Sequence, residues 1–310
     1  MFPAQQSVFP GAGDGYRGPA LLPPLARFFV AALWTVVVFW GCGAIYALFP
    51  ARNLLPDLLF SVMTCVLTGA GFGFCVRVLD GNPKPYAAAL SLPLDPTALR
   101  QWGSGAALGG LLICADAGCV AVLGSLEFHF HISRLMLMRG AAVAVLLLFA
   151  ALLEELAFRG YPFQKLTETC GALWAVLLLS LLFGAVHLWN PSSGGWRSWG
   201  FWNTVIVGLV LALARIRSGS LWLPFGMHFG WNLFQGAVLG FPVSGLRDFS
   251  SLITARCQGP VLLTGGAYGP EASATCAVVL LLGIPLLWRL TSERNIQHRP
   301  VRLPPQSGIL

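Results

Sequence analysis

The sequence predicts an all-α fold, a polytopic transmembrane helical bundle with about eight spans. Three observations support this prediction: 56% of the 310 residues are hydrophobic, only 10% are charged, and the mean hydropathy is +0.73. Soluble domains carry about 25% charged residues, so this composition indicates a chain that lies in lipid. Only helices and closed barrels satisfy every backbone polar group inside a bilayer, and the long unbroken apolar runs favour helices.

Windows of about 20 residues, the length that crosses a bilayer, identify eight apolar segments. These segments are 27–49, 55–77, 103–124, 136–158, 171–188, 200–216, 220–240 and 272–290. The fifth and sixth are short for a span, which predicts tilted or irregular backbone there. We expect one membrane-embedded domain at 27–290, between a disordered cytoplasmic tail at 1–26 and a basic cytoplasmic tail at 291–310.

The positive charges predict the orientation of the bundle. The net charge of +7 comes from Lys and Arg residues scattered between the apolar segments rather than clustered, so we expect no nucleic-acid partner. With eight spans, 13 of the 19 Lys and Arg residues fall on the side of the termini and 6 on the other. Cytoplasmic loops carry the excess of basic residues, so both termini are predicted to be cytoplasmic. The basic C-terminal tail predicts contact with anionic membrane lipid.

Two adjacent carboxylates and an arginine end the fourth apolar segment, in Leu152-Leu153-Glu154-Glu155-Leu156-Ala157-Phe158-Arg159-Gly160. An ionisable group at bilayer depth costs roughly 2.5–3.5 kcal/mol on insertion scales, so such groups mark functional sites. Glu155 and Arg159 are four residues apart and share a helix face, where they can pair. Glu154 points about 100° away and has no local partner. The pattern predicts a structural ion pair beside a free carboxylate.

Two later segments carry polar residues of the same kind. Phe183-Gly184-Ala185-Val186-His187 ends the fifth segment, and His228 and Asn232 share one helix face in the seventh. Taken singly, each is explained by an interfacial histidine or by polar contacts between helices. Together, a free carboxylate, two imidazoles and a carboxamide are the groups that hydrolyse an amide. The carboxylate and one imidazole would activate water, and the remaining donors would stabilise the oxyanion.

These motifs, in this order on successive apolar segments, resemble those of the CPBP intramembrane proteases. That family includes type II CAAX prenyl endopeptidases and bacterial Abi or bacteriocin-processing proteins. The resemblance covers about a third of the chain, with the motif core at 138–240, and includes the flanking residues of Phe158-Arg159-Gly160 and Leu223-Pro224. It implies an endopeptidase acting on a membrane-associated protein or peptide, of prenylated CAAX type or bacteriocin-like. The first third of the chain and the loop 241–271 carry no such match, so the resemblance does not decide which of these substrates is cleaved.

The resemblance also implies a role for each residue of the motifs. Glu154 and His187 activate the water, His228 and Asn232 form the oxyanion hole, and Glu155, Arg159 and Phe183 support the site. A zinc-dependent version is the alternative, in which Glu154, His187 and His228 would hold zinc with a fourth position open to water. The sequence contains no HExxH motif, and we expect the metal-free glutamate mechanism.

Two alternatives from other classes remain at this stage. A non-catalytic membrane peptide-binding or immunity protein would use the same cavity, and it would not depend on Glu154. A transporter with a proton relay is the weaker alternative, because the chain shows no inverted repeat and few acids at mid-membrane besides Asp116. We expect Asp116 to be a buried, hydrogen-bonded acid. The sequence assigns no role to the loop 241–271.

Overall fold

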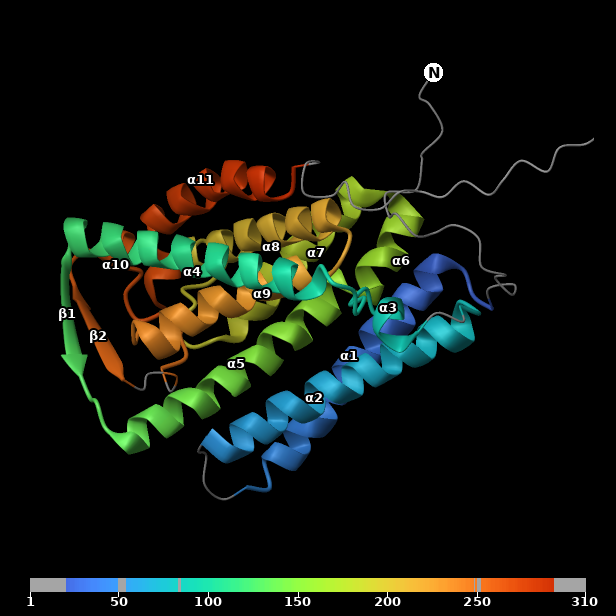
Figure 1. Cartoon of the computed structure of the whole chain (residues 1–310), viewed down its shortest axis with the longest axis horizontal. Helices are drawn as coiled ribbons and strands as arrows, with labels where there is room; N and C mark the ends of the chain where they lie inside the picture. Colours follow the sequence, from blue (N-terminus) through green and yellow to red (C-terminus); the bar gives the residue numbers. More distant parts are fainter. Residues whose placement is uncertain (1–20, 50–53, 83–84, 248, 250–251, 293–310) are drawn as a thin grey trace, which may run out of the picture.

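The computed structural model describes residues 21–49, 54–82, 85–247, 249 and 252–292, and helices dominate it (Figure 1). The long helices are α1 (Pro24–Tyr46), α2 (Leu54–Phe74), α4 (Ala98–Leu123), α5 (Arg134–Arg159), α6 (Tyr161–Cys170), α7 (Ala172–Val186), α8 (Trp199–Ser218), α9 (Trp222–Asn232) and α11 (Ala274–Leu290). Short helices are α3 (Tyr86–Ala89) and α10 (Val261–Thr264). The π-helical turns Cys75–Leu79 and Leu233–Val238 extend α2 and α9, and 3₁₀ turns occupy His187–Trp189 and Pro270–Ala272.

Each of the eight predicted apolar segments contains a helix, which confirms the all-α polytopic bundle. Within the described residues, six helical stretches are long and apolar enough to cross a membrane: 24–46, 54–79, 98–123, 134–170, 172–189 and 199–218. The segments predicted at 220–240 and 272–290 form shorter helices. Helix α11 has 17 residues, and α9 has 11 before its π-helical turn. The chain is an integral, multi-pass membrane protein.

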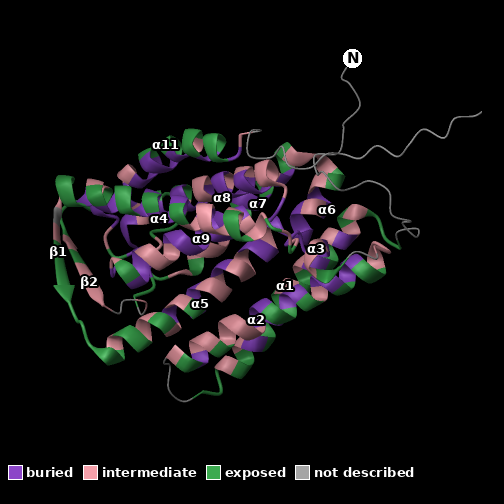
Figure 2. Cartoon of the chain, in the orientation of Figure 1, coloured by how far each residue is buried: buried purple, intermediate pink, exposed green. Residues whose placement is uncertain are grey.

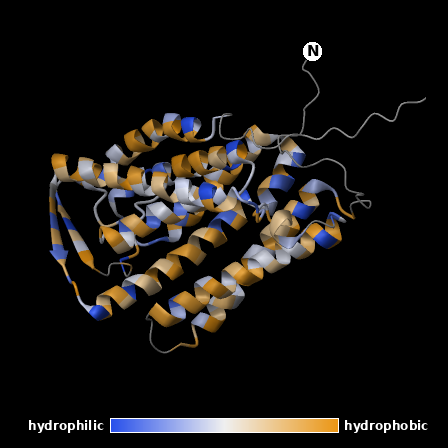
Figure 3. Ribbon diagram, viewed as in Figure 1, coloured by the Kyte–Doolittle hydropathy of each residue, from blue (hydrophilic) through white to orange (hydrophobic). Residues whose placement is uncertain are grey.

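The outer surface of the bundle is apolar, as lipid requires. Large hydrophobic side chains on α1 are exposed, including Phe29, Leu33, Trp34 and Trp40. Figure 2 shows green, exposed stretches along the outer helices, and Figure 3 shows that these helices are mostly hydrophobic. In water such a surface would drive aggregation, whereas lipid tails solvate it. Polar side chains therefore indicate a functional site mainly where they point into the interior of the bundle.

A break and a turn shape the centre of the chain. Helix α5 ends at Gly160, where a Cβ would lie 2.4 Å from the carbonyl oxygen of Leu156, so only glycine fits. Pro162 follows in the first turn of α6, where its missing N–H costs no hydrogen bond. Gly171, with φ of +85°, then turns the chain from α6 into α7. Glu154 lies 16 residues before Cys170, and His187 lies 15 residues after Ala172. The two residues are therefore at similar sequence separations from the turn at Gly171.

Helices α4 and α9 pack backbone against backbone along two pairs of glycines. A Cβ on Gly105 or Gly109 of α4 would lie 2.3 Å or 2.0 Å from a carbonyl oxygen of α9. A Cβ on Gly226 or Gly230 of α9 would lie 2.1 Å from a carbonyl oxygen of α4. This arrangement, which we call the glycine seam, is the small-xxx-small packing of membrane helices. It fixes the rotation of α9, and hence the direction in which His228 points.

Two parts of the chain predicted as loops contain strands. The connection between the third and fourth segments forms β1 (Ser125–Phe130), and the predicted loop 241–271 contains β2 (Ile253–Gln258). The strands pair antiparallel, with Leu126 opposite Cys257. Six-residue strands produce a weak period-2 signal beside apolar runs of about 20 residues, which explains why the sequence did not indicate them.

The described residues at the end of the segment 241–273 pack against the bundle. The side chain of Asn203 in α8 donates to the carbonyl oxygens of Glu271 at 2.8 Å and Ser273 at 2.7 Å. Asp116 in α4 is fully buried and accepts from Thr275 at 2.7 Å and Ser273 at 3.3 Å, which confirms it as a buried, hydrogen-bonded acid. Polar groups of α4 and α8 therefore hold the end of this segment.

Most of both predicted tails lies outside the described residues. Helix α1 begins at Pro24, so the last three residues of the segment predicted as a tail, 24–26, are helical. The fixed φ of proline favours the first turn of a helix, which is why α1 starts there. The disordered state of 1–20 and the role of 293–310 stay predictions.

Candidate active site

Helix α5 supplies two carboxylates with different surroundings. Glu155 is fully buried, and its Oε1 accepts from Arg159 Nη1 at 3.0 Å, as the four-residue spacing predicted. Arg159 also donates to the carbonyl oxygen of Gly208 in α8 at 3.3 Å, and its guanidinium carbon lies 4.3 Å from the ring centroid of Phe183. Arg159 therefore joins α5 to α7 and α8 while it neutralises Glu155.

The other carboxylate, Glu154, faces two imidazoles. Its Oε2 lies 3.9 Å from His187 Nε2 and 3.6 Å from His228 Nε2. That oxygen is buried and has no hydrogen-bond partner among the described residues. A buried polar atom without a partner marks a place where water or a ligand belongs. The structure thus brings Glu154, His187 and His228 together, from three helical segments.

Each imidazole is held through its Nδ1 atom. His187 Nδ1 lies 2.7 Å from the carbonyl oxygen of Phe183, and His228 Nδ1 lies 2.9 Å from Glu155 Oε1. A carbonyl or carboxylate oxygen can only accept, so both Nδ1 atoms carry hydrogen. The Nε2 atoms are left to face Glu154. The bond from His228 to Glu155 was not predicted, because nothing in the spacing within α5 indicates a partner on α9.

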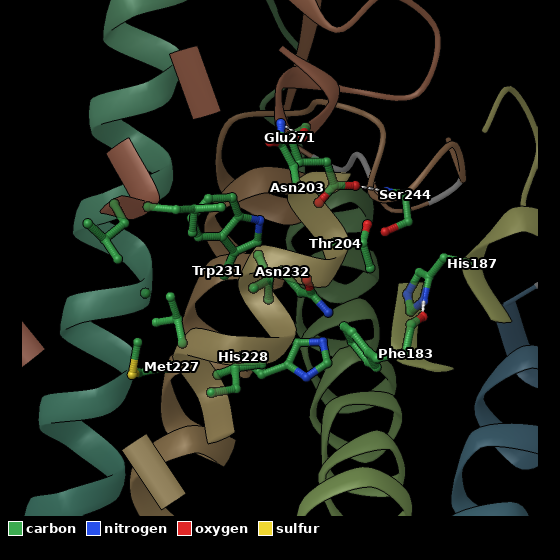
Figure 4. Close-up of a pocket in the computed structure, with 16 residues that line it drawn as sticks. Phe183, His187, Asn203, Thr204, Met227, His228, Trp231, Asn232, Ser244 and Glu271 are labelled. Atoms are coloured by element: carbon green, nitrogen blue, oxygen red, sulfur yellow. Dashed lines mark hydrogen bonds between the residues drawn. The ribbon is translucent and has the colours of Figure 1, made fainter. Parts of the chain in front are cut away.

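A cavity adjoins these groups (Figure 4). His187, His228 and Asn232 line one part of it, and Figure 4 shows the Asn232 carboxamide beside the ring of His228. Its remaining walls are largely apolar: Leu112, Val207, Val210, Leu211, Met227 and Leu280. A cavity with apolar walls and a limited set of converging polar groups is a typical ligand site.

Four further polar residues line the cavity and were missed in the sequence. They are Asn203, Thr204, Ser244 and Glu271. Asn203 and Thr204 are polar residues inside an apolar span, and this pattern could have predicted that their side chains face the interior of the bundle. Glu271 immediately precedes the last predicted span, and its backbone N–H partner is Ser244, 27 residues earlier. No local pattern predicts a contact at that separation.

The donor set of this site has the chemistry of a zinc site, although its present spacing is wide. Two imidazole nitrogens and a carboxylate are zinc ligands, and Nδ1 bonds to oxygen acceptors are the usual support of zinc-binding histidines. Within the described residues, no group of three or more His, Cys, Asp or Glu side chains is arranged to hold a metal ion. Ligation would require Glu154 and both rings to move closer together.

The motifs lie within a stretch that matches a known family. Residues 137–234 match the family described as Type II CAAX prenyl endopeptidase Rce1-like. The chain is also similar to a Bacillus subtilis (strain 168) protein described as "Uncharacterized protein YyaK", with 28% identity over 171 residues. That alignment covers 55% of this chain and 54% of the relative, so the match spans about half the length of each. No solved structure gives a significant match.

Proposed function

Because the chain carries an Rce1-like domain at residues 137–234, we propose that it is an intramembrane endopeptidase in which Glu154 and His187 activate water to hydrolyse a peptide bond. The substrate class is a membrane-associated protein or peptide. The observation that carries the proposal is the position of Glu154 Oε2, buried, without a hydrogen-bond partner and facing two imidazoles.

The hydrogen positions of His187 support a water-activating role. Its Nδ1–H donates to the Phe183 carbonyl, so Nε2 of the neutral ring presents a lone pair toward Glu154. The separation of 3.9 Å from Glu154 Oε2 is too long for a direct hydrogen bond, and a water that bridges the two groups would meet an acceptor on each side.

Hydrolysis then needs a base, an oxyanion site and a proton for the leaving amine. The water oxygen attacks the carbonyl carbon while its proton passes to Glu154, and the same proton later reaches the amine nitrogen as the C–N bond breaks. The developing oxyanion accepts from the Asn232 carboxamide and from His228. His228 has committed its Nδ1–H to Glu155, so it donates from Nε2 only as the imidazolium, with Glu154 and Glu155 as counter-charges.

The zinc version is the second candidate, and it is supported by the residue types of the donor set but not by their present spacing. Glu154, His187 and His228 would hold the ion through one carboxylate and two Nε2 atoms, and the Phe183 carbonyl and Glu155 would orient the rings. Zinc would supply Lewis acidity for the water and the carbonyl. The two versions differ in metal content, which is measured directly on the purified protein.

Replacing Glu154 by Gln tests the proposal. The variant keeps shape and hydrogen bonding but removes the base, so single-turnover cleavage of a membrane-tethered peptide should fall about 10²–10⁴-fold. The substrates are lipidated and unlipidated versions of one peptide, and Glu127→Gln, an exposed carboxylate on β1, is the matched control. Bound metal is assayed alongside. Wild-type cleavage by Glu154→Gln contradicts the mechanism, whereas no cleavage by the wild-type protein would leave a non-catalytic peptide-binding protein as the better description.

A further inference from the structure

Glu271 places a second carboxylate in the cavity, at a wall that the catalytic motifs do not supply. It precedes α11, in the segment 241–273, and lines the same cavity as His187 and Asn232. Figure 4 shows it with Ser244 and Asn203 on one side of the cavity, apart from the group formed by His187, Phe183 and His228. The family match ends at residue 234, so Ser244 and Glu271 lie outside it, whereas Asn203 lies within it.

The Glu271 carboxylate has hydrogen bonds but no cationic partner. The backbone N–H of Ser244 donates to its Oε1. Among the described residues, no Lys, Arg or His nitrogen forms a salt bridge with it. Burial raises the pKa of Glu271, while its hydrogen bonds to Ser244 oppose that rise, as would protonation of the His187 imidazole. A carboxylate without a counter-charge in a buried position is costly, so a ligand that brings a cation would relieve it.

The apolar lining of the cavity matches the stem of such a cation in chemistry. The aliphatic side chains of Val207, Leu211 and Met227 line the same cavity as Asn203, Ser244 and Glu271. Lysine and arginine bury their methylene stems along apolar surface while the charged head reaches a polar group. An acidic side chain or a free C-terminal carboxylate would instead meet the charge of Glu271.

From this arrangement we infer that Glu271 selects substrates with a basic side chain, lysine or arginine, close to the scissile bond. The position of the basic residue close to the scissile bond rests on the proposed hydrolysis. The preference for binding a basic residue rests on the cavity alone. The competing explanation is that Glu271 only braces the segment 241–273 through Ser244 and Asn203.

The test compares peptides that differ at one residue next to the cleaved bond, with Lys, Gln or Glu there. The purified full-length protein in lipid vesicles cleaves these membrane-tethered peptides, and kcat/KM is measured for each. A charged hydrogen bond predicts that wild type prefers Lys to Gln by about tenfold or more, with Glu worst. In Glu271→Gln, which keeps an acceptor for Ser244, the Lys to Gln ratio should approach one. The control Glu127→Gln should keep the wild-type ratio.

A binding measurement separates this inference from the proposed function. The Glu154→Gln protein, with and without Glu271→Gln, is titrated with the same fluorescently labelled peptides. A Lys preference that depends on Glu271 supports the inference even if no peptide is cleaved by wild type, in which case the hydrolysis proposal fails alone. Equal handling of Lys and Gln peptides by wild type overturns the inference. So does an unchanged Lys to Gln ratio in Glu271→Gln.

Discussion

His228 Nδ1 lies 2.9 Å from Glu155 Oε1, the same oxygen that accepts from Arg159 at 3.0 Å. One buried carboxylate oxygen therefore serves the ion pair within α5 and the orientation of an imidazole on α9. The pair is not a separate brace beside the site, because its loss would release the ring that faces Glu154.

Removing Arg159 should destabilise the protein and inactivate it together. In Arg159→Ala, Glu155 is left as a buried charge without its cation, which costs about 3–5 kcal/mol. The link from α5 to Gly208 in α8 is also lost. Thermal unfolding in detergent measures the effect, and Arg134→Ala, an exposed position at the start of the same helix, should change little. A fully stable but inactive Arg159→Ala protein would place the arginine in the chemistry instead.

Loss of His187 and loss of Asn232 should differ in severity. His187→Ala removes the lone pair that faces Glu154, and cleavage should fall about 10²–10⁴-fold. Asn232→Ala removes one oxyanion donor, worth about 10²–10³-fold, so a residual rate should remain measurable. Single-turnover cleavage by folded variants gives both values. If His187→Ala and His228→Ala instead each lose a stoichiometric metal ion, the zinc version replaces the glutamate version.

The glycine seam predicts a sharp difference between two alanine substitutions. Gly230→Ala places a Cβ 2.1 Å from the backbone oxygen of Ala106, so α4 and α9 must separate. Overpacking of this kind costs about 1–3 kcal/mol. Gly103→Ala, also on α4, meets nothing within 4 Å and should leave the thermal midpoint unchanged. Equal midpoints for the two variants would show that the helices do not touch along this line.

The orientation of the chain is a separate prediction. Reporter fusions after Arg289 and near Arg256 should report opposite sides of the membrane, with the end of the chain cytoplasmic, because basic residues are enriched on that side. Reports from the same side would mean that α11, the helix between the two fusion sites, does not cross.

Local spacing predicted the parts of the site that lie within one helix. The bond between Glu155 and Arg159 follows from a four-residue separation, and the freedom of Glu154 follows from its 100° offset. The helical bundle itself follows from hydropathy alone. These predictions succeeded because helical periodicity and hydropathy are local properties of the sequence, and a lipid bilayer tolerates few departures from them.

Contacts between distant segments could not be predicted in this way. The bond from His228 to Glu155 joins residues 73 apart, and Glu271 meets Ser244 through a segment with no helical period. The four glycines of the seam are visible in the sequence as two Gly-x-x-x-Gly patterns, but no spacing states that α4 and α9 are partners. Such pairings depend on the tertiary arrangement.

The glycine seam also determines which wall of the cavity can yield. With backbone against backbone, α9 has no side chains on that face to repack, so it cannot tilt toward α4 to make room. The opposite wall is built differently, since Ser244 and Glu271 belong to turns secured by hydrogen bonds such as that from Gly245 N–H to the Tyr268 carbonyl, at 2.8 Å. Any adjustment to a bulky ligand would therefore fall on the other walls of the cavity, while the histidine and carboxamide on α9 stay stationary.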